Sequence, residues 1–133
     1  MKTKVIIEGN NTDGFTAYIA DEGTPYGLIG EGNTVEETKS DFLTAYQEMR
    51  ELYLEEGRAF QELDFEFLYD LPSFLHSWAY ALTLAGLSRI TGINQGQLSH
   101  YINGTSRPAR RTVEKIQNGI SRFASELSDV KFA

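Results

Sequence analysis

The sequence contains no cysteine, and only two of its 133 residues are histidines. Without cysteine the chain forms no disulfide and offers no thiolate to a metal. His76 and His100 are far apart in the sequence, and neither has a second histidine nearby, so their spacing does not indicate a metal site. We therefore expect no metal and no cofactor.

Long apolar runs are also missing. No segment is long enough to span a bilayer, and the start, MKTKVIIEGN, lacks the hydrophobic centre of a signal peptide. We therefore expect a cytoplasmic protein that does not bind membranes. Hydrophobic residues make up 41% of the chain, which is enough for the core of one ordinary domain or of two very small ones.

Basic residues are scarce in the first half of the chain. Residues 1–70 hold five Lys or Arg against sixteen Asp or Glu, a net charge of −11. Residues 71–133 hold seven against three, a net charge of +4. A positive surface collects phosphates, whereas an acidic one repels nucleic acid and attracts basic proteins. The asymmetry predicts two domains with different partners, an acidic one over 1–70 and a basic one over 71–133.

The acidic half shows the periodicities of strands and one helix. KVIIEG is a short β-branched run, FTAYIAD alternates in polarity, and a short apolar piece surrounds Leu28 and Ile29. TVEE, residues 34–37, has the form of a capping box, and apolar residues then recur at helical spacing as far as Tyr53. LDFEFLYD alternates again. The predicted order is β-β-β-α-β.

The basic half is predicted to be entirely helical. Pro72 and Ser73 suit a helix start, and apolar residues recur from Leu75 to Leu82, which predicts a first helix with Trp78 in the core. Thr83 can cap a second helix; Gly86 either lies inside it or ends the first one. The last helix, roughly 109–127, is expected to bury five apolar residues: Val113, Ile116, Ile120, Phe123 and Leu127.

The stretch GINQGQLSHYINGTSRP, residues 92–108, has the residue order of a helix-turn-helix. Gly92 permits a tight bend, Ile93 fills the space between two helices, and Asn94 can cap the second. Leu98 and Tyr101, three residues apart, would anchor that helix to the core. The face left outward is polar and carries Gln95, Gly96, Gln97, Ser99 and His100.

This polar face suits the reading of DNA bases. Glutamine can make paired hydrogen bonds to adenine, serine can bond several bases, and a glycine allows close approach. The hydroxyls and cations that follow are suited to phosphates. The alternative is a small helical bundle with a polar surface helix. The predicted DNA-binding residues are Asn94, Gln95, Gly96, Gln97, Ser99, His100, Thr105, Ser106, Arg107, Arg110, Arg111 and Lys115.

Along nearly its whole length the chain resembles HicB-type antitoxins of type II toxin–antitoxin pairs. DGFTAYIAD followed by GLIGEGNTVEETKSDF is similar to the strand pair and helix entry of that family. TGINQGQLSHYINGTSRP is similar to the Cro and phage-repressor helix-turn-helix that many of its members carry. The resemblance implies a partial ribonuclease-H-like domain that blocks HicA, a small basic toxin that cleaves mRNA with a histidine, and a second domain that binds the operator of the pair's own operon.

We therefore expect an α+β protein with an N-terminal β-β-β-α-β partial ribonuclease-H-like domain and an all-α helix-turn-helix domain. The expected function is that of an antitoxin and not of an enzyme, since no complete ribonuclease-H carboxylate set is evident. The expected partners are a small basic HicA-like toxin and operator DNA. Helix-turn-helix proteins usually read two half-sites, so a homodimer or higher homo-oligomer is expected, with the last helix and the tail VKF as contact.

Two hypotheses of other classes stay open at this point. The chain could be a stand-alone helix-turn-helix transcriptional regulator whose acidic domain senses a ligand or a protein. It could also be a metal-dependent nuclease, if Asp13, Asp21 and Glu8, which lie near predicted strand ends, converge on Mg²⁺.

Overall fold

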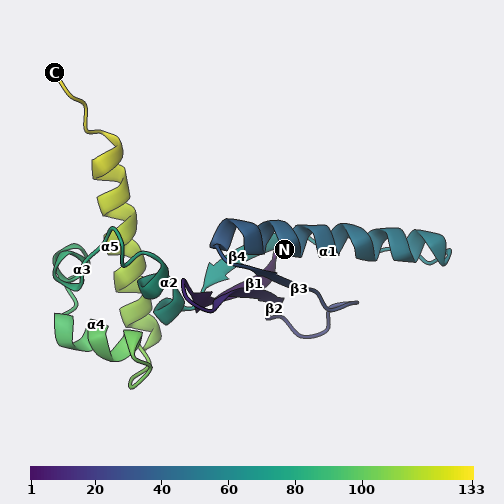
Figure 1. Ribbon diagram of the computed structural model, residues 1–133, viewed down its shortest axis with the longest axis horizontal. Coiled ribbons are helices and arrows are strands. Elements are labelled where there is room, and N and C mark those ends of the chain that lie inside the picture. Colours follow the sequence, from purple (N-terminus) through teal and green to yellow (C-terminus); the bar gives the residue numbers. More distant parts are fainter. The chain divides into compact units, whose positions relative to one another are not determined.

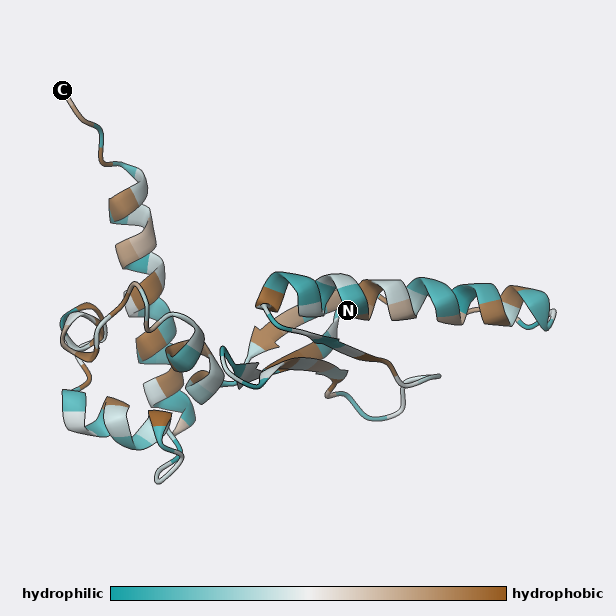
Figure 2. Cartoon of the chain, viewed as in Figure 1, coloured by the Kyte–Doolittle hydropathy of each residue, from teal (hydrophilic) through white to brown (hydrophobic).

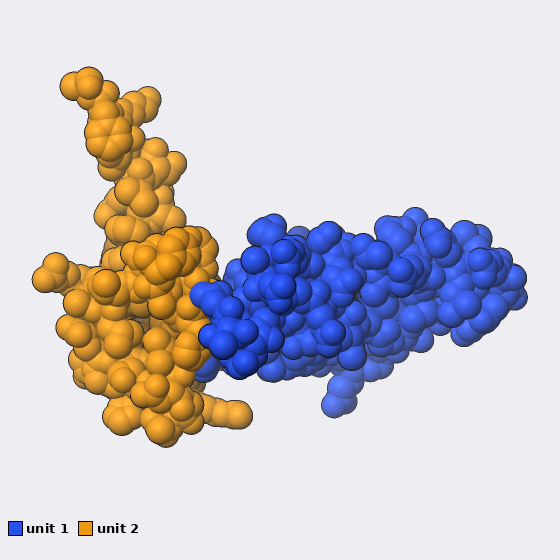
Figure 3. All heavy atoms as spheres, in the orientation of Figure 1, with its two compact units in different colours: residues 1–73 blue, residues 74–133 orange.

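The computed structural model describes residues 1–133, which form two compact units: an N-terminal unit, residues 1–73, and a C-terminal unit, residues 74–133 (Figure 3). The first contains a four-stranded sheet and a long helix, and the second is helical (Figure 1). The mixed α+β class is thus confirmed. The division lies within a short helix, α2 (Leu71–Ser77). No helix combines the length and the apolar character that crossing a bilayer requires.

The N-terminal unit has the predicted order of elements, namely β1 (Thr3–Asn10), β2 (Gly14–Ile19), β3 (Ile29–Gly32), α1 (Val35–Glu55) and β4 (Phe65–Tyr69). The strands are arranged in the order β3-β2-β1-β4. β1 pairs antiparallel with β2 and parallel with β4, and β2 pairs antiparallel with β3. The helix α1 connects the two edge strands and covers one face of the sheet (Figure 1).

Alternation along the strands decides which face α1 covers. Val5 and Ile7 of β1 are completely buried, and so is Ala17 of β2, which pairs with Ile7. Apolar residues also recur along α1 between polar ones (Figure 2), because a helix returns to the same face every three or four residues. The buried hydrophobic core of this unit consists of Val5, Ile7, Phe15, Ala17, Tyr26, Leu28, Phe42, Tyr46 and Tyr53.

Two glycines let α1 approach β3 closely. A Cβ atom on Gly30 would lie 2.5 Å from the backbone nitrogen of Phe42, and one on Gly32 would lie 2.7 Å from that of Thr38. No real Cβ tolerates such distances to backbone atoms. The second and third glycines of the motif GLIGEG, Gly30 and Gly32, are therefore required by the packing of a helix directly on the strand.

The capping box predicted at the start of α1 forms with one change. The Thr34 Oγ1 accepts a hydrogen bond from the Glu37 N–H at 3.1 Å, as expected of an N-cap. The Glu37 carboxylate reaches back, but it accepts from the N–H of Asn33 at 2.9 Å and not from that of Thr34. The side chain thereby holds the first residue of the connection between β3 and α1.

Aromatic rings close the end of this core beyond the sheet. Tyr26 stacks on Phe60 with ring centroids 5.2 Å apart, and Tyr53 meets Phe60 edge-on at 5.4 Å. The Tyr26 hydroxyl donates to the Gln61 carbonyl oxygen at 2.8 Å. Burial, and next the neighbouring Tyr46, raise the pKa of Tyr26 to about 12. These contacts tie the segment between α1 and β4 to the core.

The C-terminal unit contains α3 (Leu84–Thr91), α4 (Gln95–Ile102) and α5 (Arg110–Ser128) after the end of α2. Gly119 of α5 packs against α3, where an added Cβ would lie 2.5 Å from the Ile90 carbonyl oxygen. The buried hydrophobic residues of this unit are Leu75, Leu87, Ile93, Leu98, Tyr101 and Ile116.

The prediction of a long first helix with Trp78 in the core is wrong. α2 ends at Ser77, and Trp78 is 40% exposed. The chain turns there, because the N–H groups of Ala81 and Leu82 both donate to the Trp78 carbonyl oxygen. The Trp78 ring packs on the exposed ring of Tyr80 instead, at 5.9 Å between centroids. Gly86 lies inside α3, which settles the alternative left open by the sequence.

The predicted burial of α5 holds for only part of its apolar stripe. Ile116 is buried and Phe123 is half-buried, but Val113 and Leu127 are 42% and 58% exposed, so their predicted burial is wrong. The contact of α5 with α3 includes Gly119 and Arg122, which lie between these two exposed positions in the sequence. The last turns of α5 extend past the other helices of the unit (Figure 1).

Candidate nucleic-acid interface

The connection between α3 and α4 is built from three residues with separate tasks. Gly92 ends α3 in the left-handed conformation, with φ of 75°, and its N–H donates to the Ser88 carbonyl oxygen at 2.8 Å. Ile93 is buried between the helices. The Asn94 Oδ1 accepts from the Gln97 N–H at 2.8 Å and so caps α4. The three residues fix the start of α4 relative to α3.

A fourth residue, Thr91, supports this connection and was not predicted from the sequence. Its buried hydroxyl donates to the Leu87 carbonyl oxygen at 2.7 Å and accepts from the Ile93 N–H at 3.2 Å. One side chain thus bonds to backbone on both sides of the bend. Because it makes both hydrogen bonds, the polar hydroxyl can be buried at little cost. A threonine just before a helix-ending glycine is the only sequence signal for this role.

α4 presents opposite faces to the core and to solvent. Leu98 and Tyr101 are buried, as predicted for the anchors of this helix. Positions on the outward side carry short or amide-bearing polar side chains. Gln95, Gly96, Gln97 and His100 are exposed, and Ser99 is half-buried. Five of the proposed DNA-binding residues therefore lie on one short helix whose orientation is fixed by two buried anchors.

His100 holds the loop that follows α4. Its Nδ1 lies 2.9 Å from the Thr105 Oγ1, and the Thr105 hydroxyl donates to the His100 carbonyl oxygen at 3.2 Å. The Thr105 side chain thus contacts both the ring and the backbone of His100. His100 and Thr105 therefore organise the loop, and Ser106 and Arg107 are exposed beyond them.

The start of α5 concentrates positive charge. Its N-cap, Ala109, makes no side-chain capping bond, and Arg110 and Arg111 are the first two residues of the helix. Cations at a helix N-terminus oppose the helix dipole, whereas an anion there is favoured. Arg110 lies 3.4 Å from the Glu114 carboxylate, and both side chains are largely exposed. This end of α5 therefore has free donors and positive charge suited to a phosphate.

Further cations follow on one side of α5. Lys115 lies beside the connection between α3 and α4, because a Cβ on Gly92 would be 3.3 Å from the Lys115 Cε. Arg111, Lys115 and Arg122 line one shallow depression. Arg122, which was not predicted, donates from Nη2 to the Ile90 carbonyl oxygen at 3.2 Å. Its spacing of seven residues from Lys115 places it on the same side of the helix and could have identified it.

The carboxylates of the alternative nuclease hypothesis do not converge. Asp13 and Asp21 lie beyond opposite ends of β2, and Glu8 lies within β1. Asp21 accepts from the Lys4 N–H at 2.7 Å, and Glu8 accepts from the Tyr18 hydroxyl at 2.7 Å. No group of three or more His, Asp or Glu residues in the structure could hold a metal ion. The convergence expected under that hypothesis is therefore wrong.

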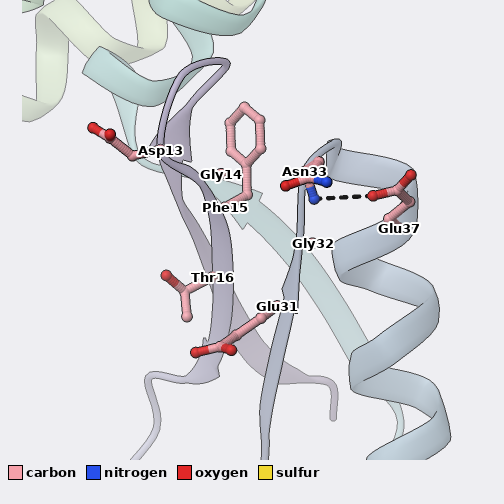
Figure 4. Close-up of a pocket in the computed structure, with 8 residues that line it drawn as sticks. All are labelled: Asp13, Gly14, Phe15, Thr16, Glu31, Gly32, Asn33 and Glu37. Carbon is pink, nitrogen blue, oxygen red and sulfur yellow. Dashed lines mark hydrogen bonds between the residues drawn. The ribbon is translucent and has the colours of Figure 1, made fainter.

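A second set of carboxylates borders a depression of about 450 Å³ at one end of the sheet (Figure 4). Asp13, Glu31 and Glu37 line it from the β1–β2 turn, β3 and α1 respectively. In Figure 4 the Asp13 side chain points away from the other two, and Glu37 is bonded to Asn33. The arrangement offers no pair of carboxylates aimed at one reacting atom.

Comparison with known proteins finds no matching family model, no similar curated protein and no similar solved structure. The assignment of function therefore depends on the geometry of the two units, on their opposite charges and on the resemblance of the two motifs.

Proposed function

We propose that this protein is an antitoxin with two separate activities. Its C-terminal unit binds operator DNA through α3 and α4, which act as a helix-turn-helix, and so represses its own operon. Its N-terminal unit, as a partial ribonuclease-H-like domain, binds and blocks a small basic toxin of the HicA kind. The observation that carries the proposal is the polar outward face of α4, held by two buried anchors in the basic unit of an otherwise acidic chain.

In the DNA-binding half, α4 enters the major groove with its first turn leading. Gln95 and Gln97 are exposed there, and an amide side chain can make two hydrogen bonds to adenine. Gly96 has no side chain to hold the helix away from the base edges. Ser99 and His100 follow on the exposed side. These contacts supply the sequence preference, because they reach groups that differ between base pairs.

The cations of α5 and the preceding loop bind the phosphate backbone. Arg107, Arg110 and Arg111 surround an uncapped helix start, and Lys115 lies beside the start of α4. Phosphate contacts position a protein on the duplex and do not read its sequence. They also make the affinity depend on salt, since each neutralised phosphate releases counterions.

In the toxin-binding half, charge supports the assignment. Residues 1–73 have a net charge of −11, so this unit repels nucleic acid and attracts basic proteins over a distance. A toxin that cleaves mRNA must itself attract phosphates, so its RNA-binding surface is complementary to an acidic one. Such complementarity raises the association rate and favours occlusion of the toxin's RNA site.

A homodimer through α5 would place two α4 helices on one operator. Val113 and Leu127 are exposed, as are Val130 and Phe132 in the tail. Two half-sites about 34 Å apart require a two-fold symmetric protein. Sedimentation equilibrium of the full chain should give twice the monomer mass, and Leu127→Lys should reduce it toward that of the monomer. An unchanged mass for the variant would assign the contact elsewhere.

The DNA half is tested with selected duplexes from a randomised pool. Gln95→Ala and Gln97→Ala should each relax the preference at one position, at about 1 to 3 kcal/mol for each lost bidentate contact. Arg111→Ala should weaken binding to every sequence and flatten the salt dependence. Gln117→Ala, an exposed glutamine on α5, is the matched control and should change neither. If the two α4 variants bind like the parent, the assigned recognition face is wrong.

The toxin half is tested by affinity capture with the full chain in cells of its source. A small basic protein should be retained in stoichiometric amount, and it should slow growth when produced without the antitoxin. In a cleavage assay, adding the antitoxin to this protein should leave the mRNA uncleaved. If no basic protein is retained, the chain is better described as a stand-alone regulator.

A further inference from the structure

The sheet of the N-terminal unit has one face that no helix of that unit covers. α1 packs on the side of Val5, Ile7 and Ala17, and the N-terminal unit has no second helix on the other side of the sheet (Figure 1). We call this other side the open face. Strand alternation assigns its members, which are Lys4, Ile6, Glu8, Thr16, Tyr18, Ile29, Glu31, Glu66 and Leu68.

Four apolar side chains form a continuous row across the open face. Strand register places Ile29 opposite Tyr18, Tyr18 opposite Ile6, and Ile6 opposite Leu68. The row thus crosses β3, β2, β1 and β4 without interruption. Ile29 is 63% exposed, and the other three are half-buried. A sheet with one face in water normally carries polar residues on that face, so a row of this kind marks an interaction surface.

Carboxylates border the row on both sides. On one side Glu31 pairs across the strands with Thr16, and Thr16 pairs with Glu8. On the other side Glu66 of β4 pairs with Lys4, the single cation of the face. The Tyr18 hydroxyl, in the centre, donates to the Glu8 carboxylate at 2.7 Å. The open face therefore has an apolar middle and an acidic rim.

We propose that the open face is where the N-terminal unit docks its basic partner, which presents an apolar patch bordered by Lys and Arg. This inference rests on the proposed function, because it places the toxin on one surface of the unit. Apolar contact in the middle with complementary charge at the rim is the usual composition of a specific protein interface.

Charge argues against the other occupants of such a face. A second copy would bring Glu8, Glu31 and Glu66 against their own counterparts, on units of net charge −11 each. Nucleic acid and anionic lipid surfaces are repelled for the same reason. A basic protein is the one class of partner that both the row and its rim attract.

Two matched pairs of variants test the proposal in the full chain. Ile29→Lys places a cation in the apolar row, and Leu54→Lys makes the same change on α1, where Leu54 is 70% exposed. Glu66→Lys reverses a rim charge, and Glu48→Lys does so on the exposed side of α1. All four positions are exposed, so thermal unfolding should stay close to that of the parent. The probe is the basic protein that the unsubstituted chain retains, titrated into each variant.

Ile29→Lys should weaken binding at least about tenfold, and Glu66→Lys should slow association most strongly at low salt, while both α1 controls bind like the parent. A photo-crosslinking residue at position 29 should attach to the basic protein, and one at position 54 should not. Equal binding by Ile29→Lys and Leu54→Lys, or crosslinking from position 54 alone, would refute docking on the open face. Neither result would affect the antitoxin assignment. Crosslinking from position 29 to a second copy of this chain would also refute docking of the basic protein on the open face. If no basic protein is retained at all, the proposed function and this inference fail together.

Discussion

The two units bury their cores in different ways. In the N-terminal unit a sheet and one long helix enclose large rings, among them Phe15, Phe42 and Tyr46. In the C-terminal unit Tyr101 is the single aromatic residue in a core of leucine and isoleucine side chains. A core of fewer and smaller side chains removes less apolar surface from water, so it contributes less to stability. The helical unit therefore depends more on its helix caps and close backbone contacts for stability.

Both units nevertheless contain a close contact where only glycine fits. In the N-terminal unit Gly30 lies under α1, and in the C-terminal unit Gly119 lies against α3. The surroundings differ, because Gly30 belongs to a strand and Gly119 to a helix. Alanine gains helix propensity at the second position and nothing comparable at the first. The loss of unfolding free energy on replacing each glycine by alanine therefore reports how easily each core can adjust to an added methyl group.

The largest effect is expected for Gly30→Ala. The added methyl would meet the backbone of Phe42 at 2.5 Å, so α1 must shift away from β3. Overpacking of this kind costs about 3 kcal/mol of unfolding free energy when backbone must move. Gly27→Ala is the matched control, since nothing lies within 4 Å of a Cβ there. Urea unfolding followed by circular dichroism should show the loss for Gly30→Ala alone. Equal stability of the two variants would mean that α1 yields easily.

A smaller effect is expected for Gly119→Ala. The methyl would lie 2.5 Å from the Ile90 carbonyl oxygen and must separate α3 from α5. The gain of about 1 kcal/mol in helix propensity offsets part of this cost, leaving a net loss of roughly 1 to 2 kcal/mol. Trp78, the one tryptophan of the chain, lies in this unit, so its fluorescence reports the transition. Gly96→Ala, on the exposed side of α4, should instead stabilise the unit. A loss for both variants would refute this account.

Local patterns predicted what depends on neighbours in the sequence. The β-β-β-α-β order, the Thr34 and Asn94 caps and the bend at Gly92 follow from period and capping chemistry, which act within a few residues. The anchors Leu98 and Tyr101 were predicted for the same reason.

The sequence did not predict where helices end, which parts of them are covered by other elements, or how distant strands pair. The stripe of α5 has a helical period along its whole length, yet Val113 and Leu127 are exposed, because a period does not say which part of a helix its neighbours cover. Trp78 fits the apolar period of the predicted first helix, but α2 ends one residue before it, at Ser77. The row from Ile29 to Leu68 depends on strand register between segments far apart in the sequence, which no periodicity contains.

Removing the Asn94 cap of α4 should lower the unfolding free energy of the helical unit by about 1 kcal/mol. Asn94→Ala removes the acceptor for the Gln97 N–H and leaves that group to water. Asn94→Ser keeps an oxygen in the same place and should recover most of the loss. Trp78 fluorescence during denaturation gives both values. If the alanine variant unfolds at the same denaturant concentration as the parent, α4 is held by Leu98 and Tyr101 alone.

The smallest effect at neutral pH is expected at Tyr26 in the aromatic core. Tyr26→Phe removes one hydrogen bond, to the Gln61 carbonyl oxygen, at a cost of about 0.5 kcal/mol. The pH dependence is more diagnostic, because burial raises the pKa of Tyr26 from 10 to about 12. The fold thus favours the neutral phenol, so this contribution is complete below pH 10 and is lost as pH rises to about 12. The difference in unfolding free energy between parent and variant should therefore shrink across that interval. A difference that stays constant from pH 10 to 12 would show that the Tyr26 hydroxyl is open to solvent, and that the aromatic core is looser than its ring contacts indicate.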